Sequence, residues 1–206
     1  MARYLMTHSL LSSWLYAMKD SPFEDATSER DAFGEFLQVL RREPTPTTEA
    51  MQKGIDFEDL VTAIVRNDAE GMRRNPDWYD AAKQIAQIVG GGSLQHRARK
   101  VIAVSGMMFV IYGRLDALKA GTIYDIKFSG SYDRGEYFDS TQHPMYFELV
   151  PEANDFVYLV SNGNEVYRER YRRDETADIT VTIGSFVSWL TANGLLETYK
   201  RHWQAL

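Results

Sequence analysis

Two carboxylates in the middle of the chain are placed where they could hold a divalent metal, with a lysine beside them. Asp116 closes the segment Gly113-Arg114-Leu115-Asp116, and Asp125 and Lys127 stand in Tyr124-Asp125-Ile126-Lys127. Mg²⁺ and Mn²⁺ prefer carboxylate oxygens as ligands, and two close carboxylates repel each other unless a cation lies between them. We therefore expect a hard divalent cation, Mg²⁺ (or Mn²⁺), between them.

A tight turn between the two segments would bring the acids together. Ala120-Gly121 suits a two-residue hairpin turn, because glycine readily adopts positive φ. In that register Asp116 lies across from Asp125, at a Cβ separation of about 4.5–5.5 Å, and Arg114 lies across from Lys127. Alternation along the strands puts these four charged residues on one face of the hairpin. The other face is apolar and is expected in the core: Ile111, Leu115, Ala117, Tyr124, Ile126 and Phe128.

The same charges admit simpler arrangements. Asp116 and Lys127 could form a cross-strand ion pair on the surface, with Asp125 neutralised by Arg114. Arg114 could equally serve a structural ion pair or approach a phosphate group. Four alternating charges above an apolar hairpin face favour the metal site over a purely solubilising role.

The motifs occur in an order that resembles the PD-(D/E)XK nuclease superfamily, most closely its RecB-like exonuclease branch. That branch combines an upstream helix carrying Gly-x-x-x-Glu or Gly-x-x-x-His with the acidic hairpin and a later Gln-x-x-x-Tyr helix. The matching positions here are Gly54 to Glu58, Asp116, Asp125 to Lys127, and Gln142 to Tyr146. Each motif is weak alone, and their shared order is the signal.

The resemblance implies a role for each matching residue. Asp116, Asp125 and the backbone carbonyl of Ile126 would be the metal ligands. Lys127 would orient or deprotonate the attacking water and stabilise the phosphorane. Glu58 would assist the metal directly or through water, although many members of the branch have histidine there. These roles together describe a Mg²⁺-dependent phosphodiester hydrolase.

The downstream helix carries two further residues of interest. Gln142 and Tyr146 are one helical turn apart and project together. By resemblance they would contact nucleic acid or support the geometry of the metal site. Judged without the resemblance, Tyr146 is an ordinary core aromatic and Glu58 an ordinary solvated helix residue. The four histidines have no metal-ligand spacing to one another.

Length and composition indicate one ordinary globular domain over residues 1–206. The chain is 44% hydrophobic and 25% charged, and its formal net charge of −6 argues against a protein that coats nucleic acid. The absence of cysteine excludes disulfides and thiolate metal sites. No signal peptide and no stretch of transmembrane length is evident, so we expect a cytoplasmic protein with no membrane contact.

The pattern of elements predicts an α/β fold with a central mixed sheet flanked by helices. The resemblance implies that this is a restriction-endonuclease-like core. Residues 1–92 read as mainly helical, and residues 93–206 as the sheet-containing part. The predicted helices are 9–19, 28–42, one from Thr48, one from Asn75-Pro76 to the glycines at 90–92, 140–150 and 184–203. The predicted strands are 101–104, 109–118, 123–128, 156–160 and 165–171, the last two flanking a turn at Asn162-Gly163.

Three functions fit these patterns. The first is a Mg²⁺-dependent DNA exonuclease of recombination, repair or phage DNA processing, whose partners would be DNA and a recombination or annealing protein. The second is a catalytically inactive module of the same fold that binds DNA or protein. The third is an endonuclease of restriction or junction-resolving type. Metal binding separates the second from the others, and closed-circular DNA separates the third.

Overall fold

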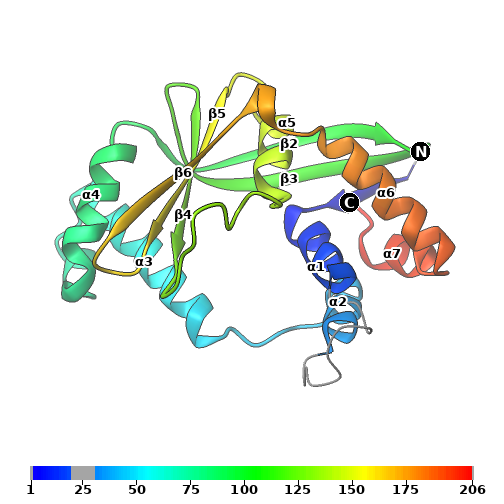
Figure 1. Cartoon of the computed structure of the whole chain (residues 1–206), viewed down its shortest axis with the longest axis horizontal. Helices are drawn as coiled ribbons and strands as arrows, with labels where there is room; N and C mark the ends of the chain where they lie inside the picture. The colour runs from blue at the N-terminus through cyan, green and yellow to red at the C-terminus, as the bar shows by residue number, and fades with distance from the viewer. Residues whose placement is uncertain (1, 20–30, 206) are drawn as a thin grey trace.

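The computed structural model describes residues 2–19 and 31–205, and it is an α/β fold built on a mixed six-stranded sheet (Figure 1). This confirms the predicted fold class. The strands are β1 (Arg3–Met6), β2 (Ser93–Val104), β3 (Met107–Lys119), β4 (Thr122–Phe128), β5 (Asp155–Ser161) and β6 (Val166–Arg172). The α-helices in the described part are α1 (His8–Lys19), α2 (Ala32–Leu40), α3 (Glu49–Arg66), α4 (Tyr79–Val89), α5 (Gln142–Leu149), α6 (Ile179–Ala192) and α7 (Leu196–His202).

The long strand β3 organises the sheet. β2 pairs antiparallel along one edge of β3, from Met107 to Leu118. The opposite edge is shared, because β1 pairs parallel with residues 108–111 and β4 pairs antiparallel with residues 117–119. Residues 112–116 lie between these two partners on that edge, with no strand beside them. The sheet therefore opens at its centre, next to the predicted acidic residues.

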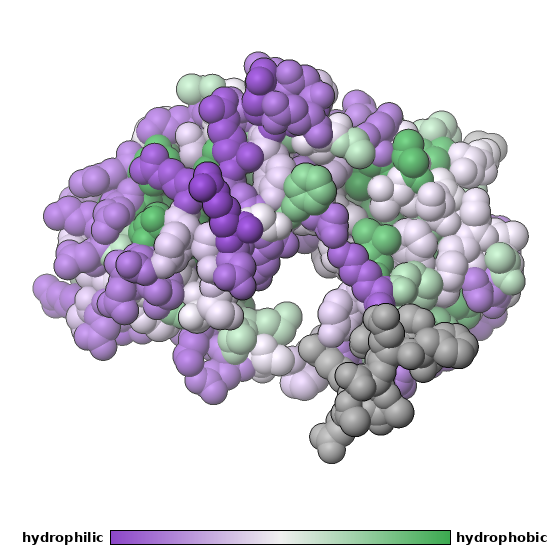
Figure 2. All heavy atoms as spheres, in the orientation of Figure 1, coloured by the Kyte–Doolittle hydropathy of each residue, from purple (hydrophilic) through white to green (hydrophobic). Residues whose placement is uncertain are grey.

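Two hydrophobic cores cover opposite faces of the sheet. The larger lies under α1, α2, α5, α6 and α7 and includes Leu11, Phe36 and Phe186. The smaller lies under α3 and α4, where Phe57 and Ile85 are fully buried. Figure 1 shows α3 and α4 at one end of the sheet and α1, α2, α6 and α7 at the other. Figure 2 shows the surface hollowed between the part that holds α3 and the part that holds α1.

Helix α3 illustrates how local signals set an element that positions the site. Thr48 caps its start by accepting a hydrogen bond from the backbone N–H of Met51 at 3.2 Å. Asn67 ends it in the left-handed conformation at φ 56°. Phe57 and Leu60 form the buried stripe between these ends. That stripe packs α3 against the sheet. Glu58, which lies between Phe57 and Leu60 in the sequence, points toward the strands.

The structure corrects several predicted elements in the N-terminal part. Residues 3–6, within the region read as helical, form β1, which pairs in parallel with β3 at one end of the strand order. A four-residue strand whose parallel partner lies a hundred residues away leaves no local sequence signal. The predicted start of a helix at residue 28 lies outside the described residues; α2 begins at Ala32 after its cap Asp31. Asn75-Pro76 opens a 3₁₀ turn before α4, and Asn75 makes no side-chain capping bond.

The hairpin predicted around Asn162-Gly163 is confirmed, and its loop is residues 162–165, since Ser161 pairs with Val166. The C-terminal part differs from prediction in two places. β2 begins at Ser93 rather than at 101, because its polar residues lie on an exposed face of the sheet. The single helix predicted over 184–203 is two helices, α6 and α7, separated at Asn193-Gly194, where Gly194 has φ 68°.

None of the helices in the described residues is by itself long and apolar enough to cross a membrane; α6 and α7 satisfy that criterion only jointly, and they are bent by 116°.

Candidate active site

The predicted hairpin turn is confirmed, and the two strands separate immediately beyond it. Ala120 and Gly121 have φ of 49° and 74°, as a type I′ turn requires. The observed pairs run from Lys119 with Thr122 to Ala117 with Tyr124 and stop there. Asp116 and Asp125 follow in the same register but face a widening gap instead of a paired ladder.

The gap is filled by the side chain of Asp116. Its Oδ2 accepts a hydrogen bond of 2.7 Å from the backbone N–H of Ile126, the group that a neighbouring strand would otherwise bind. The N–H and C=O of one strand residue point to the same edge. The carbonyl of Ile126 therefore also faces this gap, beside the Asp116 carboxylate and next to Asp125.

The alternation of side chains along β3 breaks at Asp116. Leu115 packs in the larger core, whereas Ala117, two residues on, packs in the smaller core on the opposite face. Across the β2–β3 ladder the pair Gln95 with Asp116 is missing, and Gln95 has φ 51°. One residue in each strand is thus displaced from the pleat, while Leu94 with Ala117 and His96 with Leu115 keep the same register. This paired irregularity turns Asp116 toward β4, where it meets the backbone N–H of Ile126.

The structure also corrects the predicted position of Arg114. The pairs between β3 and β4 stop at Ala117 with Tyr124, so Arg114 does not pair with Lys127. It lies across from Arg97 of β2, on the face that α3 covers. Its guanidinium donates to both carboxylate oxygens of Glu58, at 3.2 and 3.1 Å. Arg114 therefore forms an ion pair with Glu58 rather than with Asp125, and its side chain is half exposed. The four charges of the hairpin do not share one face.

The predicted apolar face of the hairpin is likewise divided. Ala117, Tyr124, Ile126 and Phe128 pack together under α3 and α4, as predicted. Two other residues expected on that face, Ile111 and Leu115, belong to the core on the opposite side.

Asp125 is held by two neighbouring side chains although it is almost fully buried. It is 3% exposed, and its Oδ1 accepts a hydrogen bond from Gln142 Nε2. Lys127 Nζ lies 2.8 Å from Oδ2 as an ion pair. That contact lacks hydrogen-bond geometry, so Oδ2 is buried without a hydrogen-bond partner. A divalent cation would compete with the Lys127 ammonium for this oxygen.

The pKa values of the site residues reflect several negative charges that lie close together. Burial, then the charges of Asp125 and Glu58, raise the pKa of Asp116 well above its ordinary value. Burial is also the main cause that raises the pKa of Glu58. Burial alone would lower the pKa of Lys127, but the neighbouring carboxylates outweigh it and raise the pKa. The site thus keeps a cationic lysine among acids that are costly to ionise together.

The donor set at this gap fits a divalent cation. Asp116 and Asp125 supply carboxylate oxygens, one of them buried and without a hydrogen bond, and Ile126 supplies a carbonyl. Hard cations prefer such oxygen donors and complete their shells with water. Within the described residues no three acidic, histidine or cysteine side chains are close enough to hold a metal by themselves. Glu58 forms an ion pair with Arg114 in this arrangement.

Helix α5 supports the site from the larger core. Gln142 and Tyr146 are 5% and 3% exposed. Gln142 holds Asp125, and the Tyr146 hydroxyl donates to the backbone carbonyl of Arg114 at 3.1 Å, on the unpaired edge of β3. Of the two predicted roles, this placement favours support of the geometry over contact with nucleic acid.

Gly113 makes room for that support, and its replacement by alanine is expected to destabilise the protein. A Cβ at this position would lie 2.5 Å from Cε1 of Tyr146 and 3.1 Å from Cδ1 of Leu149. Overpacking of this kind costs about 1–3 kcal/mol. Urea unfolding should show the loss, and Gly130→Ala, where a Cβ meets open space, is the matched control. Equal stability of the two variants would contradict this account.

Two residues that sequence reasoning overlooked lie against the site. His8 at the start of α1 packs edge-on against the Tyr146 ring and senses the charges of Lys127 and Asp125. Burial lowers the pKa of His8 to about 4, so it is neutral at physiological pH. Tyr158 of β5 places its ring 6.0 Å from Lys127 Nζ. Neither has a sequence signal, because each is brought to the site only by the packing of distant elements.

A buried carboxylate fixes the segment between β4 and α5. Glu169 of β6 accepts hydrogen bonds from the backbone N–H groups of Gly135 and Tyr137 and from the hydroxyls of Tyr132 and Tyr171. The Tyr137 ring also stacks on Tyr158 at 4.3 Å. This network lowers the pKa of Glu169 despite its burial. It anchors the segment that follows Lys127.

His143 should make stability depend on pH. It stacks on Tyr171, and burial lowers its pKa to about 4 from 6.5. Below pH 6.5 the unfolded chain binds the proton first, so the unfolding free energy should fall between pH 6.5 and 4, by up to about 3 kcal/mol. Urea titrations across that range should show a shallower slope for His143→Phe, which keeps the stacking. An unchanged slope would refute this cause.

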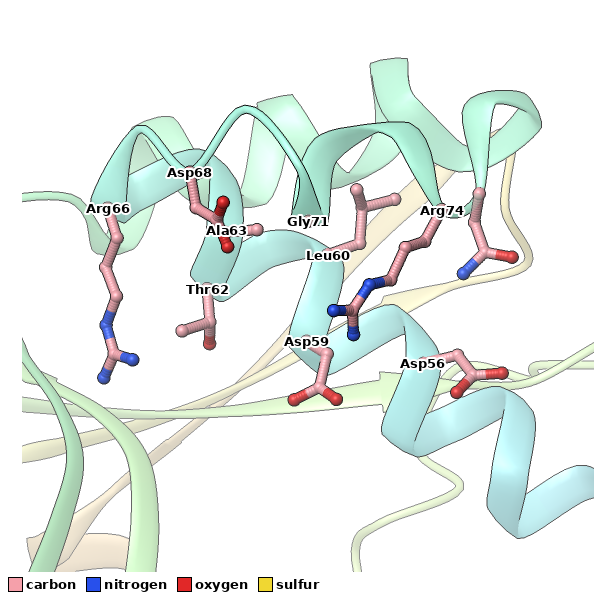
Figure 3. Close-up of a pocket in the computed structure, with 10 residues that line it drawn as sticks. Asp56, Asp59, Leu60, Thr62, Ala63, Arg66, Asp68, Gly71 and Arg74 are labelled. Carbon is pink, nitrogen blue, oxygen red and sulfur yellow. The ribbon is translucent and has the colours of Figure 1, made fainter.

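A polar pocket of about 220 Å³ lies elsewhere on α3. Figure 3 shows Asp56, Asp59 and Arg74 among its lining residues. None of the hairpin residues lines it, so it is separate from the candidate site.

Comparison with known proteins supports the fold but names no activity. No family model and no curated protein matches the chain. Among the solved structures that do match is the crystal structure of SSO0001, with a TM-score of 0.52 and 14% sequence identity. The alignment covers 92% of this chain and 76% of that one. At this identity the likeness concerns the fold alone, the α/β architecture that carries the acidic gap.

Proposed function

We propose that this protein is a metal-dependent nuclease that hydrolyses phosphodiester bonds in DNA, acting as an exonuclease. The observation that carries the proposal is the composition of the gap between β3 and β4. There, Asp116, Asp125, the Ile126 carbonyl and Lys127 meet around a buried carboxylate oxygen without a hydrogen bond. A buried carboxylate oxygen without a hydrogen bond needs an explanation, and a bound metal ion would supply one.

The residues of the gap would have different roles in the reaction. Asp116, Asp125 and the Ile126 carbonyl would hold Mg²⁺ (or Mn²⁺), which when bound lowers the pKa of water and neutralises charge on the phosphate. Lys127, kept protonated by its neighbours, would position the attacking water and oppose the charge that develops on the phosphorane. Gln142 fixes the Asp125 carboxylate for this task.

Glu58 and Arg114 would act at the border of the site. Their ion pair leaves Arg114 half exposed, while Glu58 is mostly buried. A phosphate group is a competing partner for a guanidinium. Arg114 would therefore contact the substrate phosphate, and Glu58 would be released to help the metal through water.

A second function, a nucleic-acid-binding module without catalysis, is favoured by one observation. Lys127 already neutralises Asp125 without a metal, and the described residues hold no cluster of three metal-binding side chains. Isothermal titration with Mn²⁺ separates the two, together with digestion of linear DNA in Mg²⁺ and in EDTA. Mn²⁺ binding with Mg²⁺-dependent digestion supports the nuclease; absence of both supports the binding module. Release of mononucleotides, with closed-circular DNA left intact, supports exonuclease action.

A further inference from the structure

A groove of about 990 Å³ crosses the sheet beside the candidate site. β1, β2 and β3 form its floor, and within the described residues α3 and α4 pack against the other end of the sheet. Tyr112 and Val101 are 39% and 41% exposed there. Its lining includes Arg97, Arg99, Arg114, Tyr112 and Val101.

The charge of the groove is uniformly basic. None of the described residues that line it is acidic, and no ion pair within the described part of the chain reaches Arg97 or Arg99. Arg97 lies directly across from Arg114 on the neighbouring strand. Like charges in that position destabilise a sheet unless an anion lies between them. On a chain whose net charge is −6, a basic face of this kind indicates a binding site for a polyanion.

The groove ends at the candidate active site. Arg114 lines it and also forms the ion pair with Glu58, and it precedes the ligand residue Asp116 by two positions. Arg99 lies across from Tyr112, so a basic and an aromatic side chain stand side by side further along the floor. A chain of phosphates laid over Arg99 and Arg97 would thus arrive at Arg114 and the acids.

We propose that this groove binds single-stranded DNA and leads it to the acidic gap, with phosphates on Arg97 and Arg99 and a base on Tyr112. The inference rests on the proposed nuclease function, because the position of the groove beside the site matters only if that site cleaves DNA. A single strand is favoured over a duplex because the exposed ring of Tyr112 and the apolar floor at Val101 suit unstacked bases. A duplex would present only its phosphates and sugars to the floor of the groove.

The test measures binding without cleavage. The anisotropy of a fluorescein-labelled oligothymidylate is followed in EDTA with the wild type, with the double variant Arg97→Ala/Arg99→Ala, and with Arg168→Ala. Arg168 is the matched control, an exposed arginine on the distant strand β6. The double variant should bind roughly tenfold more weakly or worse, and the slope of log affinity against log salt should fall by about 1.4, the value for two phosphate contacts on a single strand.

The aromatic contact has its own pair of variants. Tyr112→Ala should weaken binding roughly fivefold or more, whereas Tyr112→Phe should keep most of it, because the ring and not the hydroxyl stacks on a base. Thermal unfolding verifies that each variant is folded.

Several outcomes would contradict the proposal that this groove binds single-stranded DNA. These are undiminished binding by the double variant, an equal loss in Arg168→Ala, or tighter binding of a matched duplex or RNA strand. Because no metal is present in this assay, loss of the groove and failure of the nuclease proposal give different results.

Discussion

Replacing Asp125 with asparagine should abolish Mg²⁺-dependent cleavage of DNA, by about 10³-fold or more, while the protein stays folded. The introduced amide would still offer an oxygen to Gln142 Nε2, so the hydrogen bond that holds the side chain is kept. The negative charge on the buried Oδ2 is lost, and with it the attraction for a divalent cation. The measurement is the initial rate of nucleotide release from linear DNA at saturating Mg²⁺.

The matched control is Asp174→Asn. Asp174 is exposed and pairs with Arg172 on the surface, so its loss removes an equal charge without touching the gap. That variant should digest DNA at the wild-type rate. If Asp125→Asn did so too, with thermal unfolding confirming an intact fold, the carboxylate pair would not be the metal site and the nuclease proposal would fail.

Replacing Lys127 with methionine should separate catalysis from metal binding. Removal of the cation that positions water should lower the cleavage rate by about 10²–10⁴-fold. Metal affinity should rise, because Lys127 Nζ at 2.8 Å competes with a dication for Asp125 Oδ2. Without either cation Asp125 is a buried unpaired charge, so the metal-free variant should be destabilised by about 3 kcal/mol. Added Mn²⁺ should therefore raise its melting temperature more than that of the wild type.

Lys200→Met is the control for the loss of an ion pair. Lys200 pairs with Glu197 at 2.8 Å on α7, away from the hairpin acids and outside the basic groove, so both cleavage and the Mn²⁺ shift should be unchanged. A Lys127→Met protein that bound Mn²⁺ more weakly than the wild type would show that the lysine supports the metal instead of competing with it. Full activity of the variant would remove Lys127 from the mechanism.

The sequence was sufficient where the cause is local. The turn at Ala120-Gly121 follows from glycine's tolerance of positive φ, and the observed pairs keep the predicted register as far as Ala117 with Tyr124. Helix α3 follows from its cap Thr48 and its apolar stripe. The residue types at the hairpin likewise predict the chemistry, because carboxylates and lysine have few other reasons to gather above an apolar surface.

The arrangement of the charges was not predictable, because it depends on the sheet as a whole. Simple alternation places Arg114 beside Lys127, but β3 and β4 stop pairing just past the turn, and Arg114 forms an ion pair with Glu58 instead. The pairing stops where β3 exchanges one partner, β1, for another, β4. No local pattern encodes this exchange, since β1 is a hundred residues away.

From sequence alone one learns which groups this protein has for chemistry: two acids and a lysine on a tight hairpin, followed by a glutamine and a tyrosine one helical turn apart. Only the tertiary structure decided how they meet. The acids converge because β3 and β4 separate just past the turn, so Asp116 must satisfy the backbone N–H of Ile126 that no strand reaches. A buried N–H must find an acceptor, and that requirement, set by the topology of the sheet, builds the site.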